Sequence, residues 1–408
     1  MLTRLLPLVL GAFAIGTETF MITGVLPIIS ADLKVSPAAA GSLVTIFALA
    51  YAFGSPLLAV ATAGIERKRL LLAAMGAFAA ANFLAAFAPS FAWLAAARVL
   101  LALTAGTFMP AATAFATATY EPSRRGHAVA LVYAGMTLAT VIGVPAGSFV
   151  AAEASWRATF IGVGVLALLA AAGVALILPR LSGLAAVSLK ERLAIARRPA
   201  VLKLLALTAL ALLGPFAANT YLGVLLESAL GVTGDWLAGL LMVFGLLSFG
   251  GSQFGGYGAD RWDRGRFIAA ILVVLIVAFA LLSIGPLLGG SVGAGAIILG
   301  LCLWGLWGWA FPVTQQARLV SLDPALAPIT LSLNTSALYL GAAAGSALGG
   351  FTIQLWSIDA LGWVAAACEV ATLAYLVATE ARLRRPKKTS AEGACTEAPQ
   401  SAAPRVAA

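Results

Sequence analysis

Charged side chains are scarce in this sequence. Only 10% of its 408 residues are Asp, Glu, Lys or Arg, whereas 62% are hydrophobic, and the mean hydropathy is +1.01. A soluble globular protein carries about 25% charged residues. The composition therefore excludes an ordinary water-soluble domain and predicts a chain solvated mainly by lipid.

Histidine and cysteine are almost as rare. The single histidine, His127, follows Arg125 at a predicted helix start, where we expect it to lie at the membrane interface. The three cysteines (Cys302, Cys368 and Cys395) are scattered, and their spacing predicts neither a metal site nor a disulfide framework. Without a nucleophile and base, a metal cluster or a G-x-x-x-x-G-K-[ST] phosphate loop, we expect no enzyme, no metal and no cofactor.

What the chain has instead is long apolar runs. A membrane-spanning helix needs about 20 apolar residues, and the first run is too long for a signal-peptide core and has no small-residue cleavage pattern. The sequence predicts an all-α membrane protein. Its twelve spans are expected near residues 6–29, 38–62, 69–88, 91–117, 126–150, 156–178, 201–226, 235–259, 267–287, 290–316, 327–352 and 359–380.

The net charge of +9 is distributed unevenly. One set of turns, with the central linker, carries most of the basic residues: Arg67, Lys68, Arg69, Arg124, Arg125, Arg180, Lys190, Arg192, Arg197, Arg198, Lys203, Arg261, Arg264, Arg266 and Arg318. The opposite side has Lys34 and Arg157 near its helix ends. This positive-inside pattern predicts cytoplasmic termini and contact with lipid rather than nucleic acid.

One charged turn occurs twice, 197 residues apart, since Gly54-Ser55 matches Gly251-Ser252 and the basic turn after Glu66 matches the one after Asp263. The second copy, GGYGADRWDRGRF, resembles the loop signature G-x-x-x-D-R-x-G-R of the major facilitator superfamily. The first copy departs from it, with Ala63 at the Asp position and Lys68 at the Gly position. The resemblance therefore assigns a gating role to Asp260 with Arg261, Arg264 and Arg266; a mere topology anchor is the alternative.

The duplication predicts two six-helix halves. We expect an N-terminal half at 1–178, a cytoplasmic linker at 179–200, a C-terminal half at 201–380 and a disordered tail at 381–408. Within the linker, residues 189–196 are amphipathic enough for a short helix on the inner membrane surface.

Small residues recur every fourth position in the fifth and eleventh spans, which allows another backbone to approach closely. The stripes are Gly135, Ala139, Gly143 and Gly147 in one span, and Gly341, Gly345 and Gly349 in the other. Pro145 is expected to kink the fifth span. The run GMTLATVIGVPAG also resembles, imperfectly, the fifth-helix motif of exporters; ordinary packing is the alternative.

Further stretches extend the resemblance over about residues 5–380: GTETFMITGVLP, RRGHAVALVYAG, WRATF and NTSALYLGAAAGSALGG. They are similar to bacterial twelve-helix drug:proton antiporters, among them chloramphenicol-resistance, sugar-efflux and purine-nucleoside-efflux permeases. In that family, spans one, four, seven and ten surround a central cavity.

Three charged residues lie within spans, where a charge costs about 2.5–3.5 kcal/mol on insertion scales. Glu18 lies about 16 Å from the outer end of span one and Arg98, matching the family's fourth-helix Arg, about 10 Å from that of span four. We expect Glu18 to carry protons, tuned by Arg98 directly or through water. A Glu18 that stays neutral, and an Arg98 bonded only to backbone carbonyls, are the alternatives. Glu369 is expected to pair with a polar group of a neighbouring helix.

Neutral polar groups and tryptophans on the other spans suit a neutral or amphipathic ligand. The expected substrate-cavity residues are Thr17, Asn219, Tyr221, Trp307, Gln315, Gln316 and Asn334. Together these patterns predict a monomeric inner-membrane transporter that exports a small organic compound (drug, sugar or nucleoside-like) in exchange for protons. An importer or uniporter of a small neutral metabolite is the alternative, and a non-transporting sensor is disfavoured because no second soluble domain is present.

Overall fold

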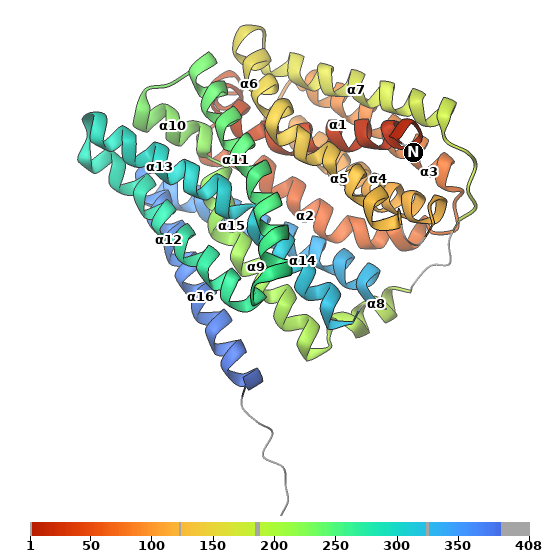
Figure 1. The fold of residues 1–408 in the computed structure, drawn as a ribbon. Coiled ribbons are helices and arrows are strands. Elements are labelled where there is room, and N and C mark those ends of the chain that lie inside the picture. The colour runs from red at the N-terminus through yellow and green to blue at the C-terminus, as the bar shows by residue number, and fades with distance from the viewer. Residues whose placement is uncertain (1, 122–123, 184–187, 324–325, 385–408) are drawn as a thin grey trace, which may run out of the picture.

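The computed structural model describes residues 2–121, 124–183, 188–323 and 326–384, and every element in these ranges is a helix (Figure 1). Twelve of these helices or helix pairs are long and apolar enough to cross a membrane, which confirms the predicted all-α, twelve-span architecture. The N-terminal spans are α1 Leu2–Asp32, α2 Pro37–Ala61, α3 Arg67–Ala86, α4 Phe91–Thr119, α5 Arg125–Leu138 continued by η2 Ala139–Gly143 and α6 Val144–Glu153, and α7 Trp156–Ile177. The C-terminal spans are α9 Pro199–Asn219, α11 Gly234–Arg261, α12 Arg264–Leu288, α13 Gly290–Gly308 continued by α14 Ala310–Leu322, α15 Ala327–Leu355 and α16 Leu361–Arg384.

Short polar residues begin several spans. Side chains of Ser36, Ser90 and Ser155 accept hydrogen bonds from backbone N–H groups three residues later, at 3.1, 3.3 and 3.2 Å, and cap α2, α4 and α7. Asp263 does the same for α12, with Oδ1 2.9 Å from the N–H of Arg266. Each cap satisfies a donor that the first helical turn leaves free.

Three spans are interrupted. In the fifth, one turn of π-helix precedes Pro145, so the predicted irregularity is present and takes the form of a π-bulge. The seventh, predicted to run without a break over 201–226, ends at Asn219 and resumes as α10, Leu222–Leu230. The tenth breaks at Trp309. Hydropathy does not reveal the last two breaks, because both sides of each are apolar.

The small-residue stripes lie where the first helix of each half packs, a partner that the sequence did not identify. A Cβ added at Gly135 would collide with the Val9 carbonyl oxygen of α1. A Cβ added at Gly345 would collide in the same way with the Leu213 carbonyl oxygen of α9. Corresponding helix pairs in the two halves therefore pack in the same way, through glycines that let the two backbones approach closely.

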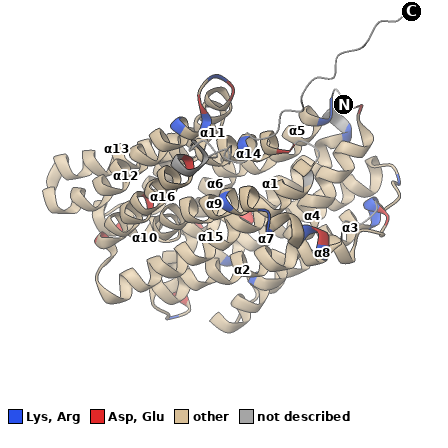
Figure 2. Cartoon of the chain, turned by 90° about the horizontal axis from the view of Figure 1, so that it is seen from below, with Lys and Arg blue, Asp and Glu red and all other residues tan. Residues whose placement is uncertain are grey.

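We call the end of the bundle with the Arg67–Arg69 and Arg264–Arg266 turns the basic end, and the other the opposite end. Most of the helix length in Figure 2 is free of charge, and Lys, Arg, Asp and Glu gather mainly toward the helix ends. His127 is exposed at the start of α5, near the basic end, in agreement with its predicted interfacial position.

The two halves meet along two main seams, α2 against α15 and α11 against the fifth span. Along one seam, α11 packs on η2 and α6, where Gly245 lies against the Thr140 carbonyl. On the described part of the chain, α11 makes no comparable contact with α5, which forms the basic-end part of the same span. Gly223 of α10 adds a second contact, against the Thr23 carbonyl of α1. Along this seam the halves thus separate toward the basic end.

The predicted linker helix is present as α8, Leu189–Ala196, which begins with a capping box formed by Ser188 and Glu191. Ile195 of α8 packs with Val201 and Leu205 of α9. Upstream, the Leu181 carbonyl accepts the Arg67 N–H at 2.8 Å, joining the linker to the first copy of the charged turn. The sequence predicts a disordered tail from residue 381, but residues 381–384 are helical and complete α16. The rest of the predicted tail, with Cys395, lies outside the described residues.

Candidate functional site

Glu18 and Arg98 form an ion pair inside the N-terminal half. The carboxylate oxygen Oε1 of Glu18, midway along α1, contacts Nη1 of Arg98 on α4, and both side chains are 0% exposed. The contact between the two side chains is direct. Placing two charges in an apolar interior is costly, and their mutual attraction offsets part of that cost.

The surroundings of the pair satisfy only some of its hydrogen-bonding groups. Arg98 Nε donates to the Leu43 carbonyl of α2 at 3.4 Å, and the guanidinium lies 4.3 Å from the centre of the Phe47 ring, a cation–π contact. Glu18 Oε2 and Arg98 Nη2 have no hydrogen-bond partner within the described ranges. The pair can therefore accept a proton or a polar ligand atom without losing a protein partner at those two atoms.

Aromatic residues cover the pair, and one of them comes from the other half. Tyr339 of α15 stacks on Tyr51 of α2 with ring centroids 3.9 Å apart, and lies 6.2 Å from Phe47. Tyr51 and Tyr339 are 4% and 7% exposed. The sequence does not single out these three rings, because a neutral aromatic residue in an apolar span carries no signal of its own. Only the contact between spans two and eleven reveals them.

A second polar group lies in the C-terminal half. Gln315 Nε2 of α14 donates to the Leu204 carbonyl of α9 at 2.8 Å and approaches Thr208 Oγ1 at 3.2 Å. Thr208 in turn donates to Asn334 Oδ1 of α15 at 2.7 Å. The structure thus brings two of the expected cavity residues together, through Thr208, which the sequence analysis did not select. These hydrogen bonds tie α9, α14 and α15 together, and Gln315 Oε1 is left without a hydrogen-bond partner among the described residues.

The other expected cavity residues are dispersed. Asn219 Nδ2 reaches Thr23 Oγ1 of α1 at 3.4 Å, a link between the halves. The Tyr221 hydroxyl donates to the Ser346 carbonyl at 3.2 Å, and its ring packs on Gly41 of α2. The remaining three lie apart from these: Thr17 is buried against Gly143, Trp307 packs against Phe254 in the C-terminal half, and Gln316 is exposed.

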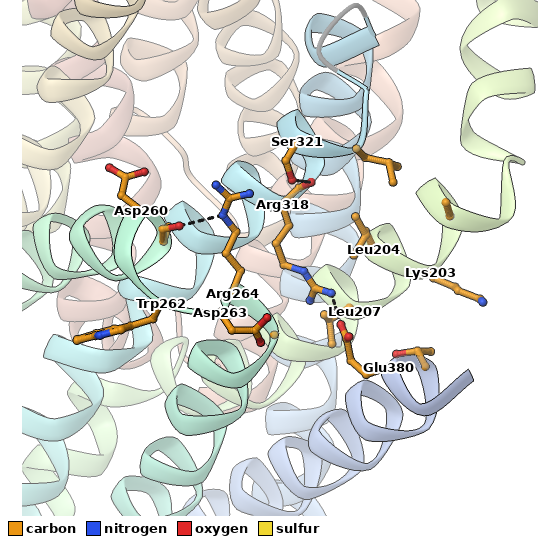
Figure 3. A pocket seen from close by; sticks show the side chains of 15 residues that line it. Lys203, Leu204, Leu207, Asp260, Trp262, Asp263, Arg264, Arg318, Ser321 and Glu380 are labelled. Carbon is orange, nitrogen blue, oxygen red and sulfur yellow. Dashed lines mark hydrogen bonds and ion pairs between the residues drawn. The ribbon is translucent and has the colours of Figure 1, made fainter. Parts of the chain in front are cut away.

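The second charged turn borders a cavity of about 550 Å³ at the basic end of the C-terminal half (Figure 3). Arg318 pairs with Glu380 across it, and Arg264 Nε donates to the Ala259 carbonyl at 2.9 Å. Of the described residues that line it, none belongs to the expected substrate set. Asp260 lines this cavity, whereas Arg261 turns onto the Tyr257 ring, 4.4 Å from its centre.

Glu369 does not have the polar partner that the sequence predicts. Its side chain in α16 is 0% exposed and faces α9 at Gly214, but neither carboxyl oxygen has a hydrogen-bond partner among the residues described. The predicted pairing with a polar group is wrong, because the facing surface of α9 is apolar at this level and presents backbone rather than a polar side chain.

Comparison with known proteins assigns the class of protein. The sequence profile of the Major Facilitator Superfamily matches residues 8–328, and the chain belongs to this family. The MFS-type transporter YbcL of Bacillus subtilis is 32% identical over 88% of this chain and 91% of its own length. The protein is therefore a multi-pass membrane transporter of small molecules and not an enzyme.

Other relatives and solved structures agree with this assignment. The chloramphenicol resistance protein of Streptomyces lividans is 37% identical over 60% of this chain and 64% of its own length. The nucleoside transporter NupG has a similar fold, with a TM-score of 0.74 and 12% identity over 92% of this chain and 99% of NupG. A bacterial homologue of the lysosomal transporter Spinster, solved inward-facing and occupied, has a TM-score of 0.68 and 19% identity over 92% of this chain and 94% of its own.

Proposed function

We propose that this transporter exports a small organic compound in exchange for protons, in the bacterial inner membrane and with both termini in the cytoplasm. The observation that supports it is the buried Glu18–Arg98 pair of the N-terminal half, covered by Tyr339 of the C-terminal half. Tyr339 moves with the C-terminal half. The access of water to Glu18 therefore depends on how the two halves are arranged.

The proposed cycle uses this link. In the present conformation Glu18 is ionised, paired and shut away from water. When the halves rock apart at the opposite end, Tyr339 moves off Tyr51 and water reaches the carboxylate. Protonation of Glu18 then breaks the ion pair and frees Arg98. After the halves close again at the opposite end, the proton leaves toward the basic end and the Glu18–Arg98 pair re-forms, because an uncompensated Arg98 is costly in an apolar interior.

The chemistry of the seam between the halves supports a neutral or amphipathic substrate. Phe20 of α1 meets Trp309 edge-on, with centroids 5.7 Å apart, and Asn219 approaches Thr23, one turn further along α1. Aromatic rings with a few neutral hydrogen-bonding groups suit a neutral or amphipathic compound. One relative is named for chloramphenicol resistance, and a membrane transporter that protects against an antibiotic must remove it.

Proton exchange supplies sufficient free energy. One charge that crosses 100 mV releases about 2.3 kcal/mol, and about 1.4 kcal/mol corresponds to a tenfold concentration ratio. One proton therefore sustains a gradient of roughly fifty-fold.

The test is Glu18→Gln, assayed with a panel of antibiotics, sugars and nucleosides that includes chloramphenicol, in efflux-deficient cells. We expect loss of export against a gradient with normal membrane insertion, because Gln keeps the shape of Glu18 but cannot ionise. Glu153→Gln, an exposed glutamate at the end of α6, is the matched control and should retain export. Full export by Glu18→Gln would refute the role of Glu18.

Direction is tested separately in vesicles of known orientation. Export by exchange predicts that adding substrate on one side moves protons to that side. Co-directional proton movement would indicate an importer, and no proton movement a uniporter.

A further inference from the structure

Glu369 is a fully buried carboxyl in the twelfth span that the proposed cycle leaves unused. It lies eight residues after Leu361, the first residue of α16, which places it about 12 Å into the helix. Its side chain is 0% exposed, so it points into the protein and not toward lipid. Both carboxyl oxygens lack a hydrogen-bond partner within the part of the chain that the structure describes.

The surface that covers Glu369 is a close contact between α16 and α9. A Cβ built on Gly214 of α9 would lie 2.7 Å from the Ala365 carbonyl oxygen, 2.9 Å from Glu369 Oε1 and 3.2 Å from Cys368 Cβ. The absence of a side chain at Gly214 is what lets the carboxyl lie against the α9 backbone. An ionised carboxylate held in this way, without a counter-charge, would be strongly destabilising.

The ionisable residues of the elements that pack on α16 do not supply that counter-charge. They are Lys203 of α9, Arg264 and Arg266 of α12, Arg318 of α14, Tyr339 of α15, Asp359 of η4, and Cys368, Tyr375, Glu380, Arg382 and Arg384 of α16 itself. Arg318 is paired with Glu380, and Arg382 and Arg384 lie 13 and 15 residues after Glu369, about 20 Å or more along α16. Lys203 is eleven residues from Gly214, about 16 Å along α9. Arg264 bonds to a backbone carbonyl, Tyr375 donates to the Lys203 carbonyl at 3.3 Å, and Tyr339 faces α2. Cys368, beside Glu369, offers no positive charge.

The helix that covers Glu369 can bend at this level. Pro215 follows Gly214 inside α9, and a proline removes one backbone hydrogen bond and weakens the helix at that point. Asn219, four residues further on, makes the contact with Thr23 of the other half. A shift of α9 at Gly214 and Pro215 would therefore both uncover Glu369 and alter a contact between the halves.

In the C-terminal half, Glu369 lies beside the position that corresponds to Glu18 in the repeat. The 197-residue offset that relates Gly54 to Gly251 relates Glu18 to Pro215. The seventh span thus lacks a carboxyl at the equivalent level, and α16 supplies one beside it.

We propose that Glu369 is a second proton-binding site of the transporter: the carboxyl is neutral while α9 and α16 are in contact, and it releases its proton when α9 moves at Gly214 and Pro215. The proposal stands on the surroundings of Glu369 and does not require Glu18 to be the coupling acid. It predicts that the C-terminal half carries a bound proton while α9 and α16 are in contact.

The direct test is infrared spectroscopy of the purified full-length protein in lipid nanodiscs. Wild type should show a protonated-carboxyl C=O band at neutral pH that is lost in Glu369→Gln. Glu380→Gln on the same helix should keep the band, because Glu380 is paired with Arg318, and Glu18→Gln should also keep it. A wild-type spectrum without this band, or a band that Glu369→Gln leaves intact, would overturn the proposal even if Glu18 proves essential for transport.

A second measurement tests the role of the α9 contact. Gly214→Ala should push α9 away from α16, so that the band disappears at lower pH than in wild type. Gly295→Ala on α13 is the control, since its Cβ would have no described atom within 4 Å. The melting temperature of wild type should fall as pH rises, while that of Glu369→Gln, or of Glu369→Met if Gln impairs folding, should not. Equal pH dependence in wild type and the variants would contradict a neutral Glu369.

Discussion

The two halves of this transporter each bury a glutamate, and they stabilise it in opposite ways. Glu18 and Glu369 are both 0% exposed. Glu18 has a guanidinium against it, whereas the Glu369 carboxyl lies against the α9 backbone at Gly214 and has no hydrogen-bond partner among the described residues. The ion pair allows a charge to persist inside the membrane, while an unpartnered carboxyl must bind a proton to remain there. Equal burial therefore says little about the charge state of an acid, and the neighbours determine it.

The two acids also respond to different movements. The aromatic cover of Glu18 includes Tyr339 from the other half, so its exposure depends on how the halves are arranged. Glu369 is covered by α9 of its own half, so its exposure depends on the bend of one helix. This contrast predicts that substitutions near Glu18 change transport through the contact between halves, and substitutions near Glu369 through local packing.

The largest effect is expected from removing the counter-charge of Glu18. Arg98→Met leaves a buried carboxylate without its partner, and breaking a buried pair in this way costs about 3–5 kcal/mol. We expect a large fall in melting temperature in detergent, most of it recovered in the double variant Glu18→Gln/Arg98→Met, in which no unpaired charge is left. If the single variant were as stable as the double one, Glu18 would already be neutral in the native protein and the contrast with Glu369 would disappear.

An intermediate effect is expected at the glycine stripes, where the halves should behave alike. A Cβ at Gly135 meets the Val9 carbonyl of α1, and one at Gly345 meets the Leu213 carbonyl of α9. Alanine at either position should lower stability by about 1–3 kcal/mol, as overpacking does in a well-filled interior. Thermal unfolding of both variants measures this.

The control for the glycine variants is Gly162→Ala in α7, since an added Cβ there has no described atom within 4 Å, and it should change little. A loss in one half and none in the other would show that the halves differ in packing as well as in their acids.

The sequence could predict the spans and the Glu18–Arg98 pair because both depend on distance along a single helix. Apolar length gives a span, and rise per residue gives the depth of a charge. The same arithmetic cannot give side-by-side contacts between helices from different halves. Tyr51 and Tyr339 are 288 positions apart in the sequence, and only the packing of α2 on α15 brings their rings together.

The prediction for Glu369 failed for a related reason. A buried acid normally has a partner, and the sequence offered polar candidates on neighbouring spans. Which face of α9 meets α16 is set by the close approach at Gly214, and that face is apolar at the level of Glu369. Likewise, the breaks at Tyr221 and Trp309 lie within apolar runs, where hydropathy has no contrast to detect.

The smallest effect is expected from an ion pair outside the apolar interior. Arg157 Nη1 lies 2.6 Å from Asp32 Oδ2 at the opposite end, and the two side chains are 36% and 44% exposed. Water and salt screen such a pair, so that it contributes about 0–1 kcal/mol. Asp32→Asn should therefore change the melting temperature only slightly, and less at high salt than at low salt. The hydrogen bond from the Trp156 indole N–H, which Asp32 accepts at 2.9 Å, can still be accepted by the Asn carbonyl oxygen. Both Asp32→Asn and Arg98→Met break one Arg–carboxylate pair. Comparing their melting temperatures under identical conditions therefore isolates the effect of burial. A loss as large as that of Arg98→Met would mean that position in the fold, rather than burial, determines the value of a charge pair in this protein.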